Sequence, residues 1–357
     1  MINFEQPVFQ NIEPRRCRDL PVSIADVARL ARVSRGTVSH VMNGSPQARI
    51  GAETRERVHK AAADLGYRPN RIARSLGRRK TDTLGLVISG LQRQNVFYAQ
   101  MIDSIESHAL TAGYQVMVDT PLHNWDASAH VEMLRGWPID GVILWTDPRE
   151  GIAARLRSSV PGLPLVMIGG QLQTGGDCIY FDVYAGARLA MEHLVSRGYR
   201  RIAYLCSYQW QDAPGDEPRH LAYRDVCQEA NIPYQPLHME RCEETRLAGL
   251  TAGMEIGDMP AHERPQAVLC WNDVIAQGFI FGLRRKGLRI PEDMAVAGFD
   301  GLDEGKYLDI PLTTVHLPMN RLCKTAVEML ISRISGECDT PAKAVGIPTE
   351  LYIGGTT

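Results

Sequence analysis

Between residues 22 and 43, apolar residues recur at helical spacing in two short runs that a tight turn separates. The first run places four apolar residues on one stripe: Ile24, Val27, Ala28 and Ala31. Ser23 precedes this run with Asp26 three residues on, which is the spacing of a helix-capping pair. The second run turns Val38, Val41 and Met42 to the same core, and Ser34 is placed to cap it. A third helix is predicted over residues 52–65.

The opposite face of the second helix is polar and carries Arg35, Gly36, Ser39 and His40. A short helix that is apolar behind and polar in front suits the major groove of DNA, where Arg reaches guanine O6 and N7. A small solvated helical hairpin explains the same residues equally well. These two runs alone leave both interpretations open.

From residue 83 onward, short apolar runs alternate with amphipathic stretches, which predicts parallel strands covered by helices on both faces. The predicted strands are residues 84–88, 116–118, 142–145, 165–168, 202–205, 268–271 and 295–299. The predicted helices between them include residues 97–112, 184–197, 219–230 and 272–286. Because about 270 residues is large for one open sheet, we predict an α/β body of two doubly wound lobes behind a small all-α head.

The charge is divided unevenly along the chain. Residues 1–80 contain 16 Lys and Arg against 7 Asp and Glu, a net charge of +9, and the remainder carries −11. A basic head on an acidic body is typical of a nucleic-acid-binding module joined to a domain that does not bind nucleic acid. Residues 1–20 are polar and aperiodic, which predicts a flexible extension.

Several functional classes are disfavoured by what the sequence lacks. The eight cysteines form no metal-binding pair, no run approaches a membrane span, and no signal-peptide core is visible, so we expect a cytoplasmic protein without membrane contact. Dinucleotide, phosphate-loop and hydrolase motifs are also missing, so we predict no enzyme, no cofactor and no metal.

Four motifs in order resemble the head of the LacI/GalR family of transcriptional regulators, which includes the lactose, galactose and purine repressors. They are S-I-A-D-V-A, V-S-x-x-T-V-S-x-V-x-N, E-T-R-E-R-V and G-Y-x-P-N-x-x-A-x-x-L, within residues 23–76. The loop over residues 44–51 is about two residues longer than is usual in the family. The resemblance favours the DNA-binding interpretation of the second helix over the solvated hairpin.

The resemblance implies roles for residues in the head and linker. Arg35, Gly36 and His40 would face base edges, and Ser34, Thr37, Ser39 and Asn43 would hold the helix on phosphates. The linker would fold as a hinge helix when two copies meet on DNA, with Leu76 wedged into the minor groove beside Ala73. Its other expected DNA contacts are Asn70, Arg71 and Arg74.

The same family implies a body similar to periplasmic sugar-binding proteins, with two lobes, three crossovers and a ligand cleft between the lobes. We therefore divide the chain into an extension (1–20), a helix-turn-helix domain (21–68), a hinge (69–81) and an effector-binding body (82–357). Within the body we predict an N-lobe from about 82–180 and 316–338. The C-lobe would combine 181–315 with 339–357.

Ligands of open α/β sheets bind beyond the carboxyl ends of the strands, where several polar and aromatic residues stand in this sequence. By family match, the polar effector contacts are Asp182, Arg219, Asn272 and Asp300, and Phe97 and Tyr98 would stack on the ligand. Ala222 replaces the glycine that usually follows the pocket arginine. Asp273 is predicted to be a helix cap, a role equally open to the other Asp and Asn residues after strands.

Together these features predict a ligand-responsive repressor that binds a pseudo-palindromic operator as a homodimer. Three stretches look most similar to the gluconate repressor branch, which suggests a sugar-acid effector with Arg219 on its carboxylate. A neutral sugar remains the alternative, and a purine is a third. The rival function is a cytoplasmic sugar-binding module without a DNA role, which would leave the basic head unexplained.

Overall fold

The computed structural model divides the chain into two units, Met1–Thr81 and Asp82–Thr357. It describes residues 22–42, 50–67, 80–89, 96–120, 127–146, 151–169, 176–206, 217–238, 245–337 and 341–357. Among these residues, no helix is both long enough and apolar enough to cross a bilayer.

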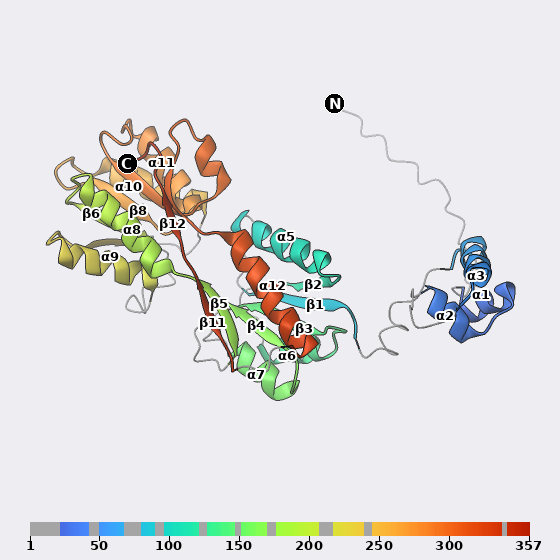
Figure 1. Ribbon diagram of the computed structural model, residues 1–357. Helices are drawn as coiled ribbons and strands as arrows, with labels where there is room; N and C mark the ends of the chain where they lie inside the picture. Colours follow the sequence, from blue (N-terminus) through green and yellow to red (C-terminus); the bar gives the residue numbers. More distant parts are fainter. Residues whose placement is uncertain are drawn as a thin grey trace, which may run out of the picture. The chain divides into compact units, whose positions relative to one another are not determined.

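The described residues of the first unit form the helices α1 (Ile24–Ala31), α2 (Arg35–Met42) and α3 (Ala52–Asp64) (Figure 1). Their inward faces form one small core of Val27, Ala28, Ala31, Val38, Val41, Val58, Ala61 and Ala62. The predicted cap of α1 is present, because the Asp26 carboxylate accepts the Ser23 N–H at 3.0 Å and the Ser23 hydroxyl at 2.6 Å. Arg32 then ends α1 in a left-handed conformation, which opens the tight turn to α2.

The second unit contains two six-stranded sheets, one in each lobe. The N-lobe sheet has the order β11-β5-β4-β3-β1-β2, and every neighbouring pair is parallel. Its strands are β1 (Thr83–Ile88), β2 (Gln115–Asp119), β3 (Gly141–Trp145), β4 (Leu165–Ile168), β5 (Asp177–Phe181) and β11 (Ala344–Ile347). Its helices are α5 (Val96–Thr111), α6 (Ala127–Arg135), α7 (Ile152–Ser159) and α12 (Met319–Ser335).

The C-lobe sheet has the order β12-β10-β9-β8-β6-β7, and only the β10–β12 pair is antiparallel. Its strands are β6 (Ile202–Cys206), β7 (Gln235–His238), β8 (Ala267–Cys270), β9 (Ala295–Asp300), β10 (Thr313–His316) and β12 (Glu350–Tyr352). Its helices are α8 (Val183–Ser196), α9 (Pro218–Glu229), α10 (Arg246–Asp258), α11 (Asp273–Arg285) and the 3-10 turn η4 (Asp303–Tyr307).

Both faces of the N-lobe sheet are covered, as the continuous burial of β1, β3 and β4 requires. In β1, Leu84, Leu86 and Ile88 belong to one core cluster, whereas Val87 belongs to another. Helix α12 packs beside α5, and α6 contacts α7 (Figure 1). The predicted doubly wound, two-lobed α/β architecture is confirmed.

The chain passes between the lobes three times: after β5, after β10 and between β11 and β12. Two of these crossovers are joined, because the Asp182 N–H donates to the Ile347 carbonyl at 3.0 Å and the Thr349 hydroxyl donates to the Asp182 carbonyl at 3.2 Å. The predicted assignment of residues 339–357 to the C-lobe is wrong for residues 344–347. These residues form β11, which pairs in parallel with β5 of the N-lobe sheet.

Candidate functional site

The outward face of α2 is polar, and its residues do not belong to the apolar core of the first unit. Arg35, Gly36 and His40 are exposed, whereas Val38 and Val41 on the opposite side are buried. Ser39 lies half-buried at the edge of this face. The face therefore holds groups that can donate to and accept from a ligand outside the unit.

Ser34 and Thr37 also hold the start of α2 together. The Thr37 N–H donates to the Ser34 hydroxyl oxygen at 3.0 Å, and the two hydroxyl oxygens lie 2.9 Å apart. Ser34 thus caps the helix, as its position in the sequence predicts. A phosphate contact from either hydroxyl would be additional to this bond.

In the part of the first unit that the structure describes, no contact requires residue 36 to be glycine. A Cβ atom built on it would meet only the Ser34 hydroxyl oxygen, at the ordinary contact distance of 3.6 Å. Glycine in a helix costs about 0.5–1 kcal/mol relative to alanine. Among the described residues, no contact repays this cost, and the open space over Gly36 leaves room for a partner to approach the backbone.

Six of the predicted DNA contacts lie outside the described residues: Asn43, Asn70, Arg71, Ala73, Arg74 and Leu76. Their roles remain predictions.

In the N-lobe, three aromatic side chains cluster beyond the carboxyl ends of β1 and β3. Phe97 and Tyr98 lie in the first turn of α5, and their ring centroids are 5.6 Å apart in an edge-to-face arrangement. Trp145, the last residue of β3, lies 5.6 Å from Phe97 and 6.3 Å from Tyr98. Phe97 is buried and Tyr98 is half-buried, so the two residues predicted to stack on the ligand contact each other, and their contact with an effector stays a prediction.

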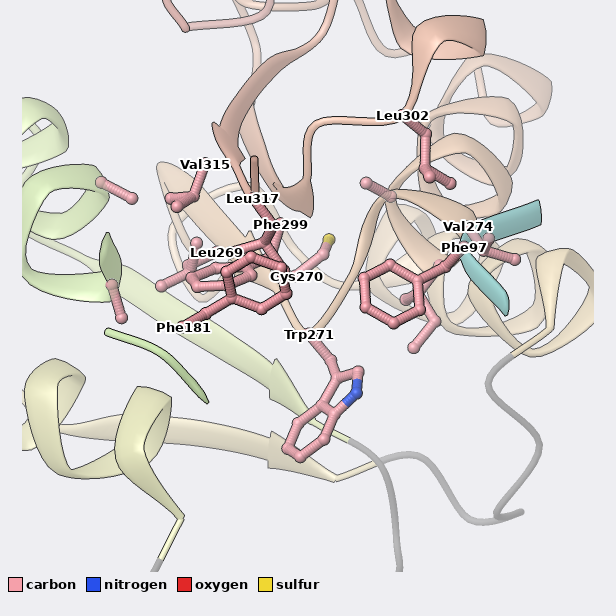
Figure 2. Close-up of a cluster of buried hydrophobic side chains, with 14 of the residues drawn as sticks. Phe97, Phe181, Leu269, Cys270, Trp271, Val274, Phe299, Leu302, Val315 and Leu317 are labelled. Carbon is pink, nitrogen blue, oxygen red and sulfur yellow. The ribbon is translucent and has the colours of Figure 1, made fainter. Parts of the chain in front are cut away.

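In the C-lobe, Arg219 lies between two aromatic rings at the start of α9. Its guanidinium carbon is 4.4 Å from the ring centroid of Trp271 and 4.4 Å from that of Phe299. Trp271 directly follows β8 and Phe299 is the second-to-last residue of β9, so both rings lie at the carboxyl edge of the C-lobe sheet. Figure 2 shows that Phe97 of the N-lobe belongs to the same buried cluster as Trp271 and Phe299. The two lobes therefore approach each other at these residues.

The charge of Arg219 is balanced by neighbouring carboxylates. Its Nη1 donates to Glu217 Oε1 at 3.0 Å, and Asp300 also acts on it electrostatically. Burial alone would lower the pKa of the Arg219 guanidinium, but Glu217, Tyr204 and Asp300 together hold this pKa above its ordinary value. Arg219 thus stays protonated in a nearly dry setting.

Asp300 has an unusual backbone. It ends β9 with φ = 114°, a value that L-residues rarely adopt, and its side chain is buried. The two backbone N–H groups that follow Asp300 are hydrogen-bonded: the Gly301 N–H donates to the Thr314 hydroxyl at 3.2 Å, and the Leu302 N–H donates to the Asp273 carboxylate at 2.7 Å. A backbone outlier that hydrogen bonds to the following residues hold in place is often found at functional sites.

The prediction that Asp273 is the cap of α11 is wrong. Asn272 is the N-cap, and its side-chain oxygen accepts the Ile275 N–H at 2.8 Å. Asp273 is instead fully buried and accepts the Thr314 hydroxyl at 2.6 Å as well as the Leu302 N–H. Asp182, an exposed residue, likewise caps α8 by accepting the Ala185 N–H at 3.0 Å. Asn272 and Asp182 therefore each have a structural task beside any effector contact.

Comparison with known proteins identifies both units. Residues 23–70 match the model of bacterial regulatory proteins of the lacI family, and residues 191–357 match the periplasmic binding protein-like domain. The chain is 34% identical over 316 residues to the HTH-type transcriptional repressor PurR of Vibrio atlanticus (strain LGP32), a match that covers 87% of this chain and 92% of that protein. The chain belongs to the LacI family.

Solved structures agree with this assignment. The lac repressor dimer bound to operator and the anti-inducer ONPF is similar at a TM-score of 0.82 and 26% identity, covering 94% of this chain and 99% of that one. The transcriptional regulator CelR in complex with cellobiose is similar at 0.66 and 27%, covering 94% and 100%. As a LacI-family member, this protein is a ligand-responsive DNA-binding regulator and not an enzyme.

The sequence analysis of this LacI-family regulator missed Glu217 and assigned the wrong role to Asp273. Glu217 carries no motif, and its relation to Arg219 depends on how the start of α9 folds. Asp273 looked like a cap because it follows a strand, whereas its partners Leu302 and Thr314 stand 29 and 41 residues away. The one feature that could have pointed to Glu217 is its place directly before a predicted helix, where an acidic side chain can act as the N-cap. Glu217 does cap α9, because its carboxylate accepts the His220 N–H at 2.8 Å.

Proposed function

We propose that this LacI-family regulator binds a pseudo-palindromic operator as a homodimer and that a small sugar-like effector between the lobes controls its DNA affinity. The observation that carries the DNA-binding half is the outward face of α2, with exposed Arg35, Gly36 and His40 over a closed apolar core. The lac repressor structure, a dimer bound to operator, supports the same arrangement here.

In this proposal, Arg35, Gly36 and His40 face base edges, and Ser34, Thr37, Ser39 and Asn43 position α2 on phosphates. The hinge over residues 69–81 orders when two copies meet on the operator, and Leu76 opens the central minor-groove step. If Leu76→Ala reduces operator affinity less than threefold, which is under about 1 kcal/mol, Leu76 does not insert into the minor groove.

The proposed effector site combines the Phe97, Tyr98 and Trp145 cluster with Arg219, Asn272, Asp182 and Asp300. Aromatic walls with a few convergent polar groups suit a small polyhydroxylated ring. Because the three crossovers are the covalent links between the lobes, an effector that contacts both lobes biases their relative angle. The change in angle acts on the hinge, which directly precedes β1. It thereby shifts the equilibrium between a state with high and a state with low affinity for DNA.

For the homodimer, we propose a contact surface formed by Leu247, Phe281 and Tyr307. These large apolar side chains are 66%, 54% and 85% exposed. They lie on neighbouring segments, because Arg246 donates to Gln277 at 3.0 Å and Arg284 pairs with Asp309 at 3.1 Å. Exposed apolar residues that gather on one face mark protein–protein contacts, and a self-complementary face gives a closed dimer.

The test of the proposal is selection of duplexes from random DNA by the full-length protein, at fixed salt. The expected result is enrichment of one palindromic sequence, whose affinity changes when a sugar that gives a thermal shift is added. If no palindrome is enriched over random DNA, with or without metabolites, the proposal is refuted.

A further inference from the structure

Asp273 is a carboxylate that helix α11 does not need as its cap. It is fully buried, and the cap is supplied by Asn272. The two carboxylate oxygens of Asp273 instead bind β10 and the turn after β9. Oδ1 accepts the Thr314 hydroxyl at 2.6 Å, and Oδ2 accepts the Leu302 N–H at 2.7 Å. Because both donors are distant in the chain, this carboxylate ties α11 to the turn after β9.

The Thr314 hydroxyl extends this contact by one residue. It donates to Asp273 and accepts the Gly301 N–H at 3.2 Å, so two consecutive N–H groups of the turn are tied to one buried carboxylate. The carbonyl of Asp300 is held as well, because it accepts the Leu317 N–H at 3.1 Å. These bonds fix the backbone around Asp300, whose φ of 114° is a value that L-residues rarely adopt.

Strand β9 makes room for the Asp273 carboxylate. Gly298 stands opposite Thr314 in the parallel pair of β9 and β10, and a Cβ atom on Gly298 would lie 2.1 Å from Asp273 Oδ1. Burying a carboxylate is unfavourable, and a glycine inside a strand weakens that strand. An apolar pair at positions 273 and 298 would fill the same space without either cost, so what the carboxylate adds is the fixed turn.

Resting on the proposed effector site, we infer that Asp273 and Thr314 are positioning residues that set effector affinity without contacting the effector. They hold the backbone of Asp300 so that its carboxylate stays at the carboxyl edge of the C-lobe sheet, where it acts electrostatically on Arg219. Neither side chain reaches a ligand itself, because Asp273 is fully buried and Thr314 is 4% exposed. Release of the turn would let Asp300 relax to a negative φ and point its side chain in another direction.

A purely structural role is the alternative, and Thr356 provides the matched control. The Thr356 hydroxyl is also buried in the C-lobe sheet, where it donates to the Val296 carbonyl at 2.6 Å and accepts the Thr313 N–H at 2.9 Å. Val296 lies near the start of β9 and Asp300 at its end, about 13 Å apart at the rise of a strand. Loss of the Thr356 hydroxyl should therefore destabilise the lobe without releasing the turn.

The test compares Thr314→Val, which keeps the β-branched shape but removes the hydroxyl, with Thr314→Ser, which keeps the hydroxyl, and with Thr356→Val. Asp273→Asn, which has one acceptor oxygen in place of two, is the second variant at the turn. Calorimetric titration of the full-length proteins at one pH uses D-glucose, D-galactose, cellobiose and D-gluconate as probes. Amide hydrogen exchange of residues 299–303 measures opening of the turn, and thermal melting measures stability.

We expect Thr314→Val and Asp273→Asn to speed exchange at the turn at least tenfold, and to weaken at least tenfold the binding of each probe that wild type binds. Thr314→Ser should stay within threefold of wild type in both measurements. Thr356→Val should lower the melting temperature and yet stay within threefold in both. The inference is overturned if Thr314→Val loses less than tenfold in probe affinity, or if Thr356→Val loses as much as Thr314→Val does. Should Thr314→Val fail to fold, Asp273→Asn is judged against Thr356→Val by the same criteria.

If no probe binds wild type, the exchange measurement decides. Faster exchange at the turn in Thr314→Val than in Thr314→Ser and Thr356→Val supports the inference, and equal exchange overturns it.

The operator assay separates this inference from the proposed function. If the probes bind as expected and no operator is selected, the proposed function falls and the positioning roles stand. If an operator is selected and responds to a probe whose affinity Thr314→Val leaves unchanged, the positioning roles fall and the proposed regulator stands.

Discussion

Substitution of Gly36 by alanine should change stability and DNA affinity in opposite directions. Inside the fold, the added methyl group meets only the Ser34 hydroxyl oxygen at 3.6 Å, so no steric cost arises. The gain is the helix propensity of alanine over glycine, about 0.5 kcal/mol, at the low end of the usual range because Gly36 lies in the first turn of α2.

On DNA, the same methyl group would fill the space through which the backbone of α2 approaches the base edges. We expect operator affinity to fall at least tenfold, which corresponds to about 1.4 kcal/mol. Amide hydrogen exchange of α2 in the full-length protein measures the gain in local stability. Fluorescence anisotropy with the selected operator, at one stated salt concentration, measures the loss in affinity.

His59→Ala is the matched control, since His59 is exposed on α3 and alanine should likewise favour the helix there. This variant should leave operator affinity within threefold. If Gly36→Ala slows exchange in α2 and yet binds the operator as tightly as wild type, Gly36 does not face DNA, and the reasoning from its empty surroundings is wrong.

Three further predictions concern base reading, the buried Asp273 and the dimer. Arg35→Ala should weaken binding to the selected operator by about 1–3 kcal/mol and relax the sequence preference at one or two base pairs. Ser39→Ala should weaken binding to all DNA sequences alike in competition assays. If Arg35→Ala also loses the same affinity for every sequence, Arg35 does not read bases. Burial raises the pKa of Asp273 to about 7, against hydrogen bonds from Thr314 and Leu302 that lower it. Because this folded-state pKa lies above the ordinary value of 3.8, the folded chain binds the proton more tightly than the unfolded chain does. The stability that Asp273 contributes therefore falls as the pH rises from about 4 to about 7, by up to about 1.4 kcal/mol per unit. In urea unfolding at pH 5 and pH 8, the free energy of unfolding of Asp273→Asn should lack this pH-dependent contribution. If it changes between the two pH values as much as that of wild type does, the assignment to Asp273 is contradicted. Tyr307→Asp should shift the dimer toward monomer in sedimentation, whereas Leu189→Asp, at another exposed apolar residue, should not; an unchanged dimer would exclude the proposed surface.

Local patterns were sufficient for much of this protein. The stripes of α1 and α2, the cap at Ser23 and the turn after Ala31 follow from interactions between residues three or four apart, which spacing in the sequence reports directly. The apolar runs that became β1, β3, β4, β6, β8 and β9 are buried on both faces, so they stand out as continuous runs.

Helix α10 was not found, and its packing explains why. Three of its five buried residues are glycines, and a Cβ atom on Gly249 or Gly253 would lie 2.2 or 2.3 Å from a carbonyl oxygen of α11. Two helices that pack backbone against backbone need no large apolar residues at the contact. The apolar periodicity that identifies other helices is therefore weak in this one.

The sequence by itself determined the helical head, its outward polar face and the alternation that makes a two-lobed α/β body, since each of these depends on neighbours along the chain. Only the tertiary structure decided that residues 344–347 join the N-lobe sheet, that Asp273 holds the Asp300 turn, and that Glu217 neutralises Arg219 between two aromatic rings. These features depend on hydrogen bonds across distant segments, or on burial that sets the strength of a charge. No spacing in the sequence encodes either of them.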